Sequence, residues 1–260
     1  MIKKSFVFLL TIALVGCAEL TQVAQHALSS SGSSSSSAAT QEASLTQSDI
    51  NSGLKEALIA GAKNAAVILG KTDGYYKDEL VKILLPSEAD VIVDNISKIP
   101  GGSQLVENAL QGINRAAEDA AKDAAPVFIN SIKSMTIVDA LDILKGKDNA
   151  ATQYLRKTTY DQLFELYQPK IKASVEKKLV GNVSTKSTWD NLTGEWNNVA
   201  GSMVGQVAGF NAVETNLEDY LTQKALDGLF LKIADQEKLI RKDPAARATN
   251  LLKKVFGSQD

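Results

Sequence analysis

The chain has 260 residues, of which 44% are hydrophobic and 22% charged, and its formal net charge is −2. This composition is ordinary for a globular protein and excludes a wholly disordered chain. No apolar run reaches the ~18–20 residues that a membrane-spanning helix requires, and the nearly balanced charge gives no reason to expect a nucleic-acid partner.

The single cysteine, Cys17, and the single histidine, His26, both precede the region that we expect to fold. That region therefore cannot hold a Ser-His-Asp or Cys-His pair, a disulfide, or a zinc site of cysteine and histidine. Chemistry there would depend on carboxylates, hydroxyls, lysine, arginine or a bound group. We expect no metal and no cofactor.

Residues 1–16 have the pattern of an export signal. Lys3 and Lys4 precede the apolar run 6–15, which as a helix would reach only ~15 Å, about half of a bilayer core. The sequence Leu14-Val15-Gly16-Cys17 then resembles the lipobox of bacterial lipoproteins. The resemblance implies cleavage before Cys17 and a lipid anchor on that cysteine. A generic secretory signal with a chance cysteine is the alternative.

The residue after the cysteine is Ala18 rather than the aspartate typical of inner-membrane retention in enteric-type bacteria. Its identity favours the periplasmic face of the outer membrane. Residues 17–47 read as the lipidated cysteine and a flexible linker, in which the nine residues 29–37 contain eight serines and one glycine. Such a segment buries too little apolar surface to offset its ordering entropy. It predicts a tether.

From residue 48 to residue 257, apolar residues recur at helical spacing and strand alternation is almost absent. This pattern predicts one all-α domain, a bundle of about nine helices. In chain order we expect helices near 49–69, 75–84, 91–93, 101–124, 127–134, 136–146, 148–167, 189–196 and 217–241, and a last helix after residue 243.

Several local signals refine these helices. In the first, apolar and small residues share one face (Leu54, Leu58, Gly61, Ala65 and Ile68), and Gly70 is placed to end it.

Capping residues mark other boundaries. We expect Thr136 to begin a helix as its N-cap with Asp139 in the first turn, Asp148 to cap the next helix, and Pro169 to interrupt or kink it. Asp243 with Pro244 is placed to start the last helix.

Glycine marks two further places. Gly181 is placed to stop the segment after Pro169, and the series Gly201, Gly205 and Gly209 favours a loop over a glycine-faced helix. The sequence Gly70-Lys71-Thr72 resembles the end of a phosphate-binding loop, but Ala65 stands where that motif needs glycine. We reject that interpretation.

Glu237 is the main candidate for chemistry, because it interrupts the apolar stripe Leu226, Phe230, Ile233 and Ile240. A buried carboxylate can act as a general acid. The plainer interpretation is a structural salt bridge with Arg241, four residues on. Likewise, Asn114, Arg115 and Glu118 form either one side of a polar cluster or a solvated helix face.

Several segments together are similar to the DUF4197 family, bacterial proteins named for a domain of unknown function. The match is carried by residues 53–58, 114–118, 135–136, 139–140, 150–154, 220–230, 240–241, 244, 247 and 251–257. It covers about 48–257 and is poor over 183–215. The resemblance implies a helical periplasmic domain, no transferable activity, and these polar positions worth testing: Asn114, Arg115, Glu118, Thr152, Lys224, Asp227, Glu237, Arg241 and Arg247.

Three functions remain open at this point. The leading one is a non-catalytic, outer-membrane-anchored module that binds an apolar small molecule or an envelope protein. The second is a carboxylate-dependent hydrolase or lyase of the cell wall, with Glu237 or Glu118 as the acid. The third is a structural envelope lipoprotein.

Overall fold

The computed structural model describes residues 45–98 and 101–260; the predictions for the signal peptide, Cys17, His26 and most of the linker concern residues outside these ranges. Over the described residues there are ten α-helices and three short 3-10 helices, and the only β-type pairing is an isolated bridge between Val180 and Val183. The predicted all-α class is confirmed, with ten helices rather than about nine.

The five long helices are α1 (Gln47–Leu69), α3 (Gly102–Ala121), α6 (Ala150–Val175), α7 (Thr185–Gly201) and α9 (Leu217–Lys242). The shorter ones are α2 (Asp90–Asp94), α4 (Ala124–Ser134), α5 (Ala140–Leu144), α8 (Met203–Val207) and α10 (Asn250–Gly257). The 3-10 helices are η1 (Ser87–Ala89), η2 (Ile96–Lys98) and η3 (Pro244–Ala246).

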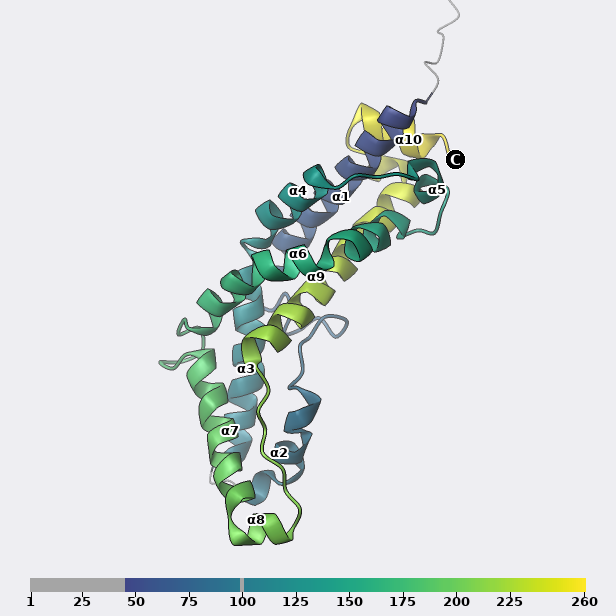
Figure 1. Ribbon diagram of the computed structural model, residues 1–260. Coiled ribbons are helices and arrows are strands. Elements are labelled where there is room, and N and C mark those ends of the chain that lie inside the picture. Colours follow the sequence, from purple (N-terminus) through teal and green to yellow (C-terminus); the bar gives the residue numbers. More distant parts are fainter. Residues whose placement is uncertain (1–44, 99–100) are drawn as a thin grey trace, which may run out of the picture. The chain divides into compact units, whose positions relative to one another are not determined.

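Helices α1 and α9 form the central pair, and α4, α5 and α10 pack around α1 (Figure 1). Helices α1 and α9 approach each other closely at Gly61, since a Cβ there would lie 3.1 Å from Ile233 Cγ2 of α9. The predicted face of α1 is buried at Leu54, Leu58 and Ala65. It is wrong at its last position, because Ile68 is 37% exposed where the helix ends.

Helix α3 packs against α6 and α7, and α6 packs against α9 (Figure 1). The predicted helix around the two tryptophans is confirmed as α7, with Trp189 and Trp196 buried. Helix α6 continues through Pro169 to Val175, so the proline does not end it.

The predicted helix over 75–84 is wrong. This segment forms turns and an extended stretch in which Asp73 has a positive φ of 67° and Tyr75 is buried. Some of its backbone groups bond within turns of the segment, as Asp78 N does to Tyr75 O, and others bond to side chains of α3, as described below. The short helix around Val91–Val93 is confirmed as part of α2.

The predicted N-caps of α5 and α6 are also wrong. Helix α5 begins after Asp139, with no side-chain cap, rather than at Thr136. Helix α6 begins after Asn149, and Asp148, expected as its cap, forms an ion pair with Lys242 on α9.

The last helix begins later than expected. Asp243 accepts a hydrogen bond from Ala245 N and so caps only η3, which has Pro244 at its start. Helix α10 has its own N-cap, Thr249.

The three glycines near residue 205 are divided among elements: Gly201 ends α7, Gly205 lies in α8, and Gly209 follows it with a φ of 72°. They form neither a single loop nor one helix face. Gly181, at a φ of 61°, lies in the turn between α6 and α7.

Candidate functional site

The cluster predicted on α3 forms around Glu118, which is buried. Its Oε1 accepts hydrogen bonds from the backbone N–H groups of Tyr75 and Tyr76, at 3.2 and 3.1 Å. Its Oε2 accepts from Arg115 at 2.6 Å, and Arg115 also donates to Asp73 at 2.6 Å. Hydrogen bonds from Lys77 and Arg115 lower the pKa of Asp73. Glu118 therefore fastens the turn that precedes the extended segment.

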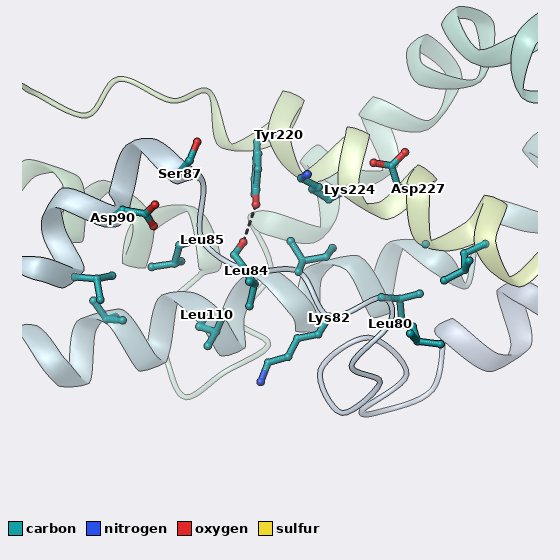
Figure 2. A pocket seen from close by; sticks show the side chains of 16 residues that line it. Leu80, Lys82, Leu84, Leu85, Ser87, Asp90, Leu110, Tyr220, Lys224 and Asp227 are labelled. Atoms are coloured by element: carbon teal, nitrogen blue, oxygen red, sulfur yellow. Dashed lines mark hydrogen bonds between the residues drawn. The ribbon is translucent and has the colours of Figure 1, made fainter.

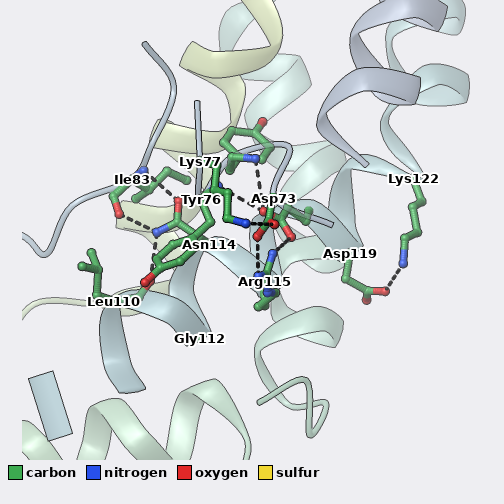
Figure 3. Close-up of polar contacts among 12 residues, drawn as sticks. Asp73, Tyr76, Lys77, Ile83, Leu110, Gly112, Asn114, Arg115, Asp119 and Lys122 are labelled. Atoms are coloured by element: carbon green, nitrogen blue, oxygen red, sulfur yellow. Dashed lines mark hydrogen bonds and ion pairs between the residues drawn. The ribbon is translucent and has the colours of Figure 1, made fainter. Parts of the chain in front are cut away.

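Asn114 fastens the extended segment itself. Its side chain accepts from Ile83 N at 2.9 Å and donates to Ile83 O at 2.7 Å, which reproduces the pairing of a neighbouring strand (Figure 3). Asn114 is fully buried. A buried backbone pair without partners would be costly, so this one amide holds 80–86 against α3.

Glu237 lies between α9 and the first turn of α6, with no exposed surface. Its oxygens accept from Ala151 N, Thr152 N and the Thr152 hydroxyl at 2.7–3.0 Å, and from Arg241 Nε at 2.9 Å. The carboxylate thus meets the free N–H groups of a helix N-terminus. Every acceptor direction of Glu237 faces a donor of the protein.

Two arginines near Glu237, Arg241 and Arg247, donate to the last carbonyl groups of helices. Arg241 donates to the carbonyls of Ile143 and Leu144 at the end of α5, at 3.0 and 2.6 Å. Arg247 is buried, donates to the carbonyls of Ile240 and Arg241, and forms a two-pronged pair with Asp260. Hydrogen bonds from Arg247 lower the pKa of the Asp260 side chain.

A groove of about 850 Å³ lies between the extended segment, α2, α3 and α9 (Figure 2). Most of its lining is apolar, and four of the lining side chains are large and exposed: Leu80, Leu84, Val93 and Leu231. Leu80 is 76% exposed and Leu84 is 62% exposed. The wall formed by 80–85 is the segment that Asn114 and Glu118 hold in place.

Polar groups of the groove come from two sides: Lys82, Ser87 and Asp90 lie on the stretch 82–90, and Tyr220, Lys224 and Asp227 recur at helical spacing on one face of α9 (Figure 2). The Tyr220 hydroxyl donates to Leu84 O at 2.8 Å, and burial, with nearby acidic residues, raises the Tyr220 pKa to about 12. Asp227 is paired with Arg156. Lys224 lies 5.7 Å from the centre of the Tyr220 ring and, among the described residues, has no carboxylate partner.

The structure thus divides the nine predicted polar positions. Asn114, Arg115 and Glu118 form one cluster, and Thr152, Glu237 and Arg241 form a second, next to Arg247. Lys224 and Asp227 line the groove. What any of them does for function stays a prediction.

Sequence reasoning missed the apolar wall of the groove, since Leu80 and Leu84 were assigned to a helix. Pro86 disfavours helical backbone only at Leu85, so it marks the end of such a helix and does not reveal that 80–84 is not helical. Over residues 45–98 and 101–260 no group of three or more Cys, His, Asp or Glu side chains is placed to hold a metal ion. Within the same ranges no helix combines the length and apolarity of a membrane span.

Comparison with known proteins gives one match. Residues 44–257 match the family model described as "Protein of unknown function (DUF4197)". The chain belongs to the DUF4197 family. The matched range includes both polar clusters and the groove, so all three lie within the DUF4197 domain. No curated protein and no solved structure matches the chain.

Proposed function

We propose that this DUF4197 protein is a non-catalytic binding module that takes an anionic amphiphile, a molecule with an apolar chain and a carboxylate or phosphate head, into the groove beside α9. The exposed leucines carry the proposal. Leu80 and Leu84 stand in a concave site whose volume, about 850 Å³, lies in the range of small-molecule pockets. Covering ~100 Å² of such apolar surface contributes ~2.5 kcal/mol.

Lys224 supports an anionic head at the α9 side of the groove. It is exposed beside the apolar wall and forms no ion pair with another described residue, whereas the neighbouring Asp227 is paired with Arg156. The other lining carboxylate, Asp90, lies at the start of α2, so the head is placed at Lys224 and not there. A head group at Lys224 would leave the apolar chain to follow α9 toward Leu231 and the extended segment toward Leu80. A small number of polar groups in a mostly apolar site is what fixes a ligand's orientation.

The two buried carboxylates favour binding over hydrolysis. A general acid must come within hydrogen-bond reach of the bond that it protonates. Glu237 and Glu118 instead direct both oxygens at backbone N–H groups and arginine, away from solvent. Acting on a cell-wall substrate would require the segments that they fasten to separate.

Lipid attachment at Cys17, with residues 17–47 as a tether, would place the module at the periplasmic face of the outer membrane. There the groove would meet amphiphiles that leave or approach the bilayer. We expect Cys17→Ala to abolish incorporation of a clickable fatty acid by cells. Equal labelling of wild type and variant would refute the anchor without touching the groove.

The groove is tested by titrating the purified chain with a fluorescent fatty acid. Leu84→Glu should weaken binding at least about tenfold, because it places a charge in the apolar wall, while leaving the thermal unfolding midpoint nearly unchanged. Val138→Glu is the matched control, since Val138 is similarly exposed and lies outside the groove. Equal affinity of the two variants would show that the probe binds elsewhere, and the proposal would fail.

A further inference from the structure

Helix α8 follows directly on α7, and we call residues 185–223, which include both helices, the α7 arm (Figure 1). Three apolar side chains of α8 are exposed. Met203, Val204 and Val207 are 84%, 78% and 86% exposed, and together we call them the apolar tip. Single exposed apolar residues are common, but a cluster on one short element marks an interaction surface.

The apolar tip is held in a defined conformation. The Ser202 hydroxyl accepts from Gly205 N at 3.0 Å, and Phe210 N donates to Gly205 O at 3.0 Å. Gly205 has no room for a side chain, because a Cβ there would lie 2.2 Å from Val199 O. At the base of the tip, Asn197 exchanges two hydrogen bonds with the backbone of Val213. The exposure of the tip is therefore built into the fold.

The arm that carries the tip is acidic. From the start of α7, residues 185–223 contain five acidic residues and one basic residue, Lys186, which pairs with Asp190, and residues 196–213 carry no charged side chain at all. The exposed Glu195 and Glu214 lie within two residues of the Asn197–Val213 pair along the chain, and so near the base of the tip. A partner surface should be an apolar concavity surrounded by positive charge.

The same chain has such a surface. A depression of about 480 Å³ at the end of α1 has a floor of Ala66, Val67 and Ala125, with Val67 59% exposed, and a rim of Lys63, Lys71 and Lys122. We call it the lysine-rimmed depression. Lys122 pairs with Asp119, whereas Lys63 and Lys71 form no ion pair with any described residue. In Figure 1 the end of α1 lies well away from α8, so one copy does not fill its own depression.

We propose that the apolar tip of one copy docks into the lysine-rimmed depression of a second copy. The contact joins two different surfaces, so it is head-to-tail, and each copy keeps one free tip and one free depression unless a ring closes. Three aliphatic side chains make a small interface, which predicts a weak contact in dilute solution. Confinement of the copies to one membrane surface would raise their effective concentration.

A bilayer is the less favoured partner for the tip. Segments that lie in membrane interfaces combine apolar residues with tryptophan, lysine or arginine, and anionic lipids attract cations. The tip lacks all of these, and its arm is acidic. The proposal does not depend on the groove beside α9, which neither surface includes.

The test uses the full chain, expressed with its export signal, with the photo-crosslinker p-benzoylphenylalanine at position 204. Irradiation of cells should yield a covalent dimer of the chain whose second site lies in residues 63–71 or 122–125. The same crosslinker at position 138, which is also exposed, should give no such dimer. Adducts only with lipid, adducts only with a different protein, or no adduct at all would each overturn the proposal.

Charge reversal then tests the rim. In the copy that receives the tip, Lys63→Glu with Lys71→Glu should lower the dimer yield at least about fivefold, because two attractions become repulsions. Glu195→Lys with Glu214→Lys in the copy that carries the crosslinker should restore it. All four side chains are exposed, so the fold should be kept. A dimer yield that stays the same after both pairs of substitutions would also overturn the proposal.

Discussion

In the C-terminal half of α9, Glu237 is buried, and both its oxygens and the guanidinium of Arg241 are bonded within the protein. In the N-terminal half of the same helix, Lys224 is exposed beside an apolar groove and has no carboxylate partner among the described residues. Glu237 and Arg241 can contribute stability, but their hydrogen-bonding groups are already used within the protein and cannot bind a ligand. Lys224 adds little stability but is available to a ligand. Polar residues on one helix thus differ in whether the protein already supplies their hydrogen-bond and charge partners, and this difference underlies the role that we propose for Lys224.

The largest expected effect is at Glu237. Glu237→Ala removes the carboxylate that pairs with Arg241 and accepts from the first N–H groups of α6, so the free energy of unfolding should fall by about 3–5 kcal/mol. Urea unfolding followed by circular dichroism measures this. Glu165→Ala, on the exposed face of α6, is the control and should change it by less than ~0.5 kcal/mol. A loss of ligand binding in fully folded Glu237→Ala would break the proposed separation of roles.

A smaller effect is expected at Asn114, which links the two regions. Asn114→Ala leaves Ile83 N–H and C=O unpaired, and stability should fall by about 1–3 kcal/mol. Because this amide holds the wall of the groove, fatty-acid affinity should fall as well. The exposed Gln104 of α3, changed to alanine, serves as control. Unchanged affinity in Asn114→Ala would show that the wall of the groove keeps its position without the hydrogen bonds of Asn114.

Lys224→Ala should weaken binding of an anionic amphiphile by about two- to fivefold, the range of an exposed charge pair. Added salt should weaken wild-type binding by a similar factor and leave the variant unaffected. The neutral alcohol of the same chain length should bind both proteins equally. If anion and alcohol lose affinity alike, Lys224 does not meet the head group.

The smallest effect concerns the start of α1. Hydrogen bonds from Lys254 and from Thr46 lower the Asp49 pKa from 3.8 to about 2. Since the folded state holds this proton less tightly, the contribution of Asp49 to stability is present above about pH 4 and is lost as pH falls toward 2. Asp49→Asn should therefore make stability less steeply dependent on pH in that window. Acid unfolding curves that superimpose would contradict this.

Much of the fold is predictable from local pattern. The ranges of α1, α3 and α9, and the middle of α7, follow from apolar spacing, because the 3.6-residue period places those side chains on one face wherever the helix packs. The burial of Glu237 is predictable in the same way, because its carboxylate lies within the apolar stripe of α9. Membership of the DUF4197 family was also legible from the sequence.

The groove was decided by tertiary structure alone. Residues 75–84 have a composition compatible with a helix, but the buried side chains of Glu118 and Asn114 offer their backbone groups partners from another helix. Asp148, expected as a helix cap, likewise pairs with a distant residue, Lys242 of α9. The sequence by itself determined the helices, because their hydrogen bonds lie within a few residues. Only tertiary structure decided where the chain leaves them, because there the partners lie far away along the chain.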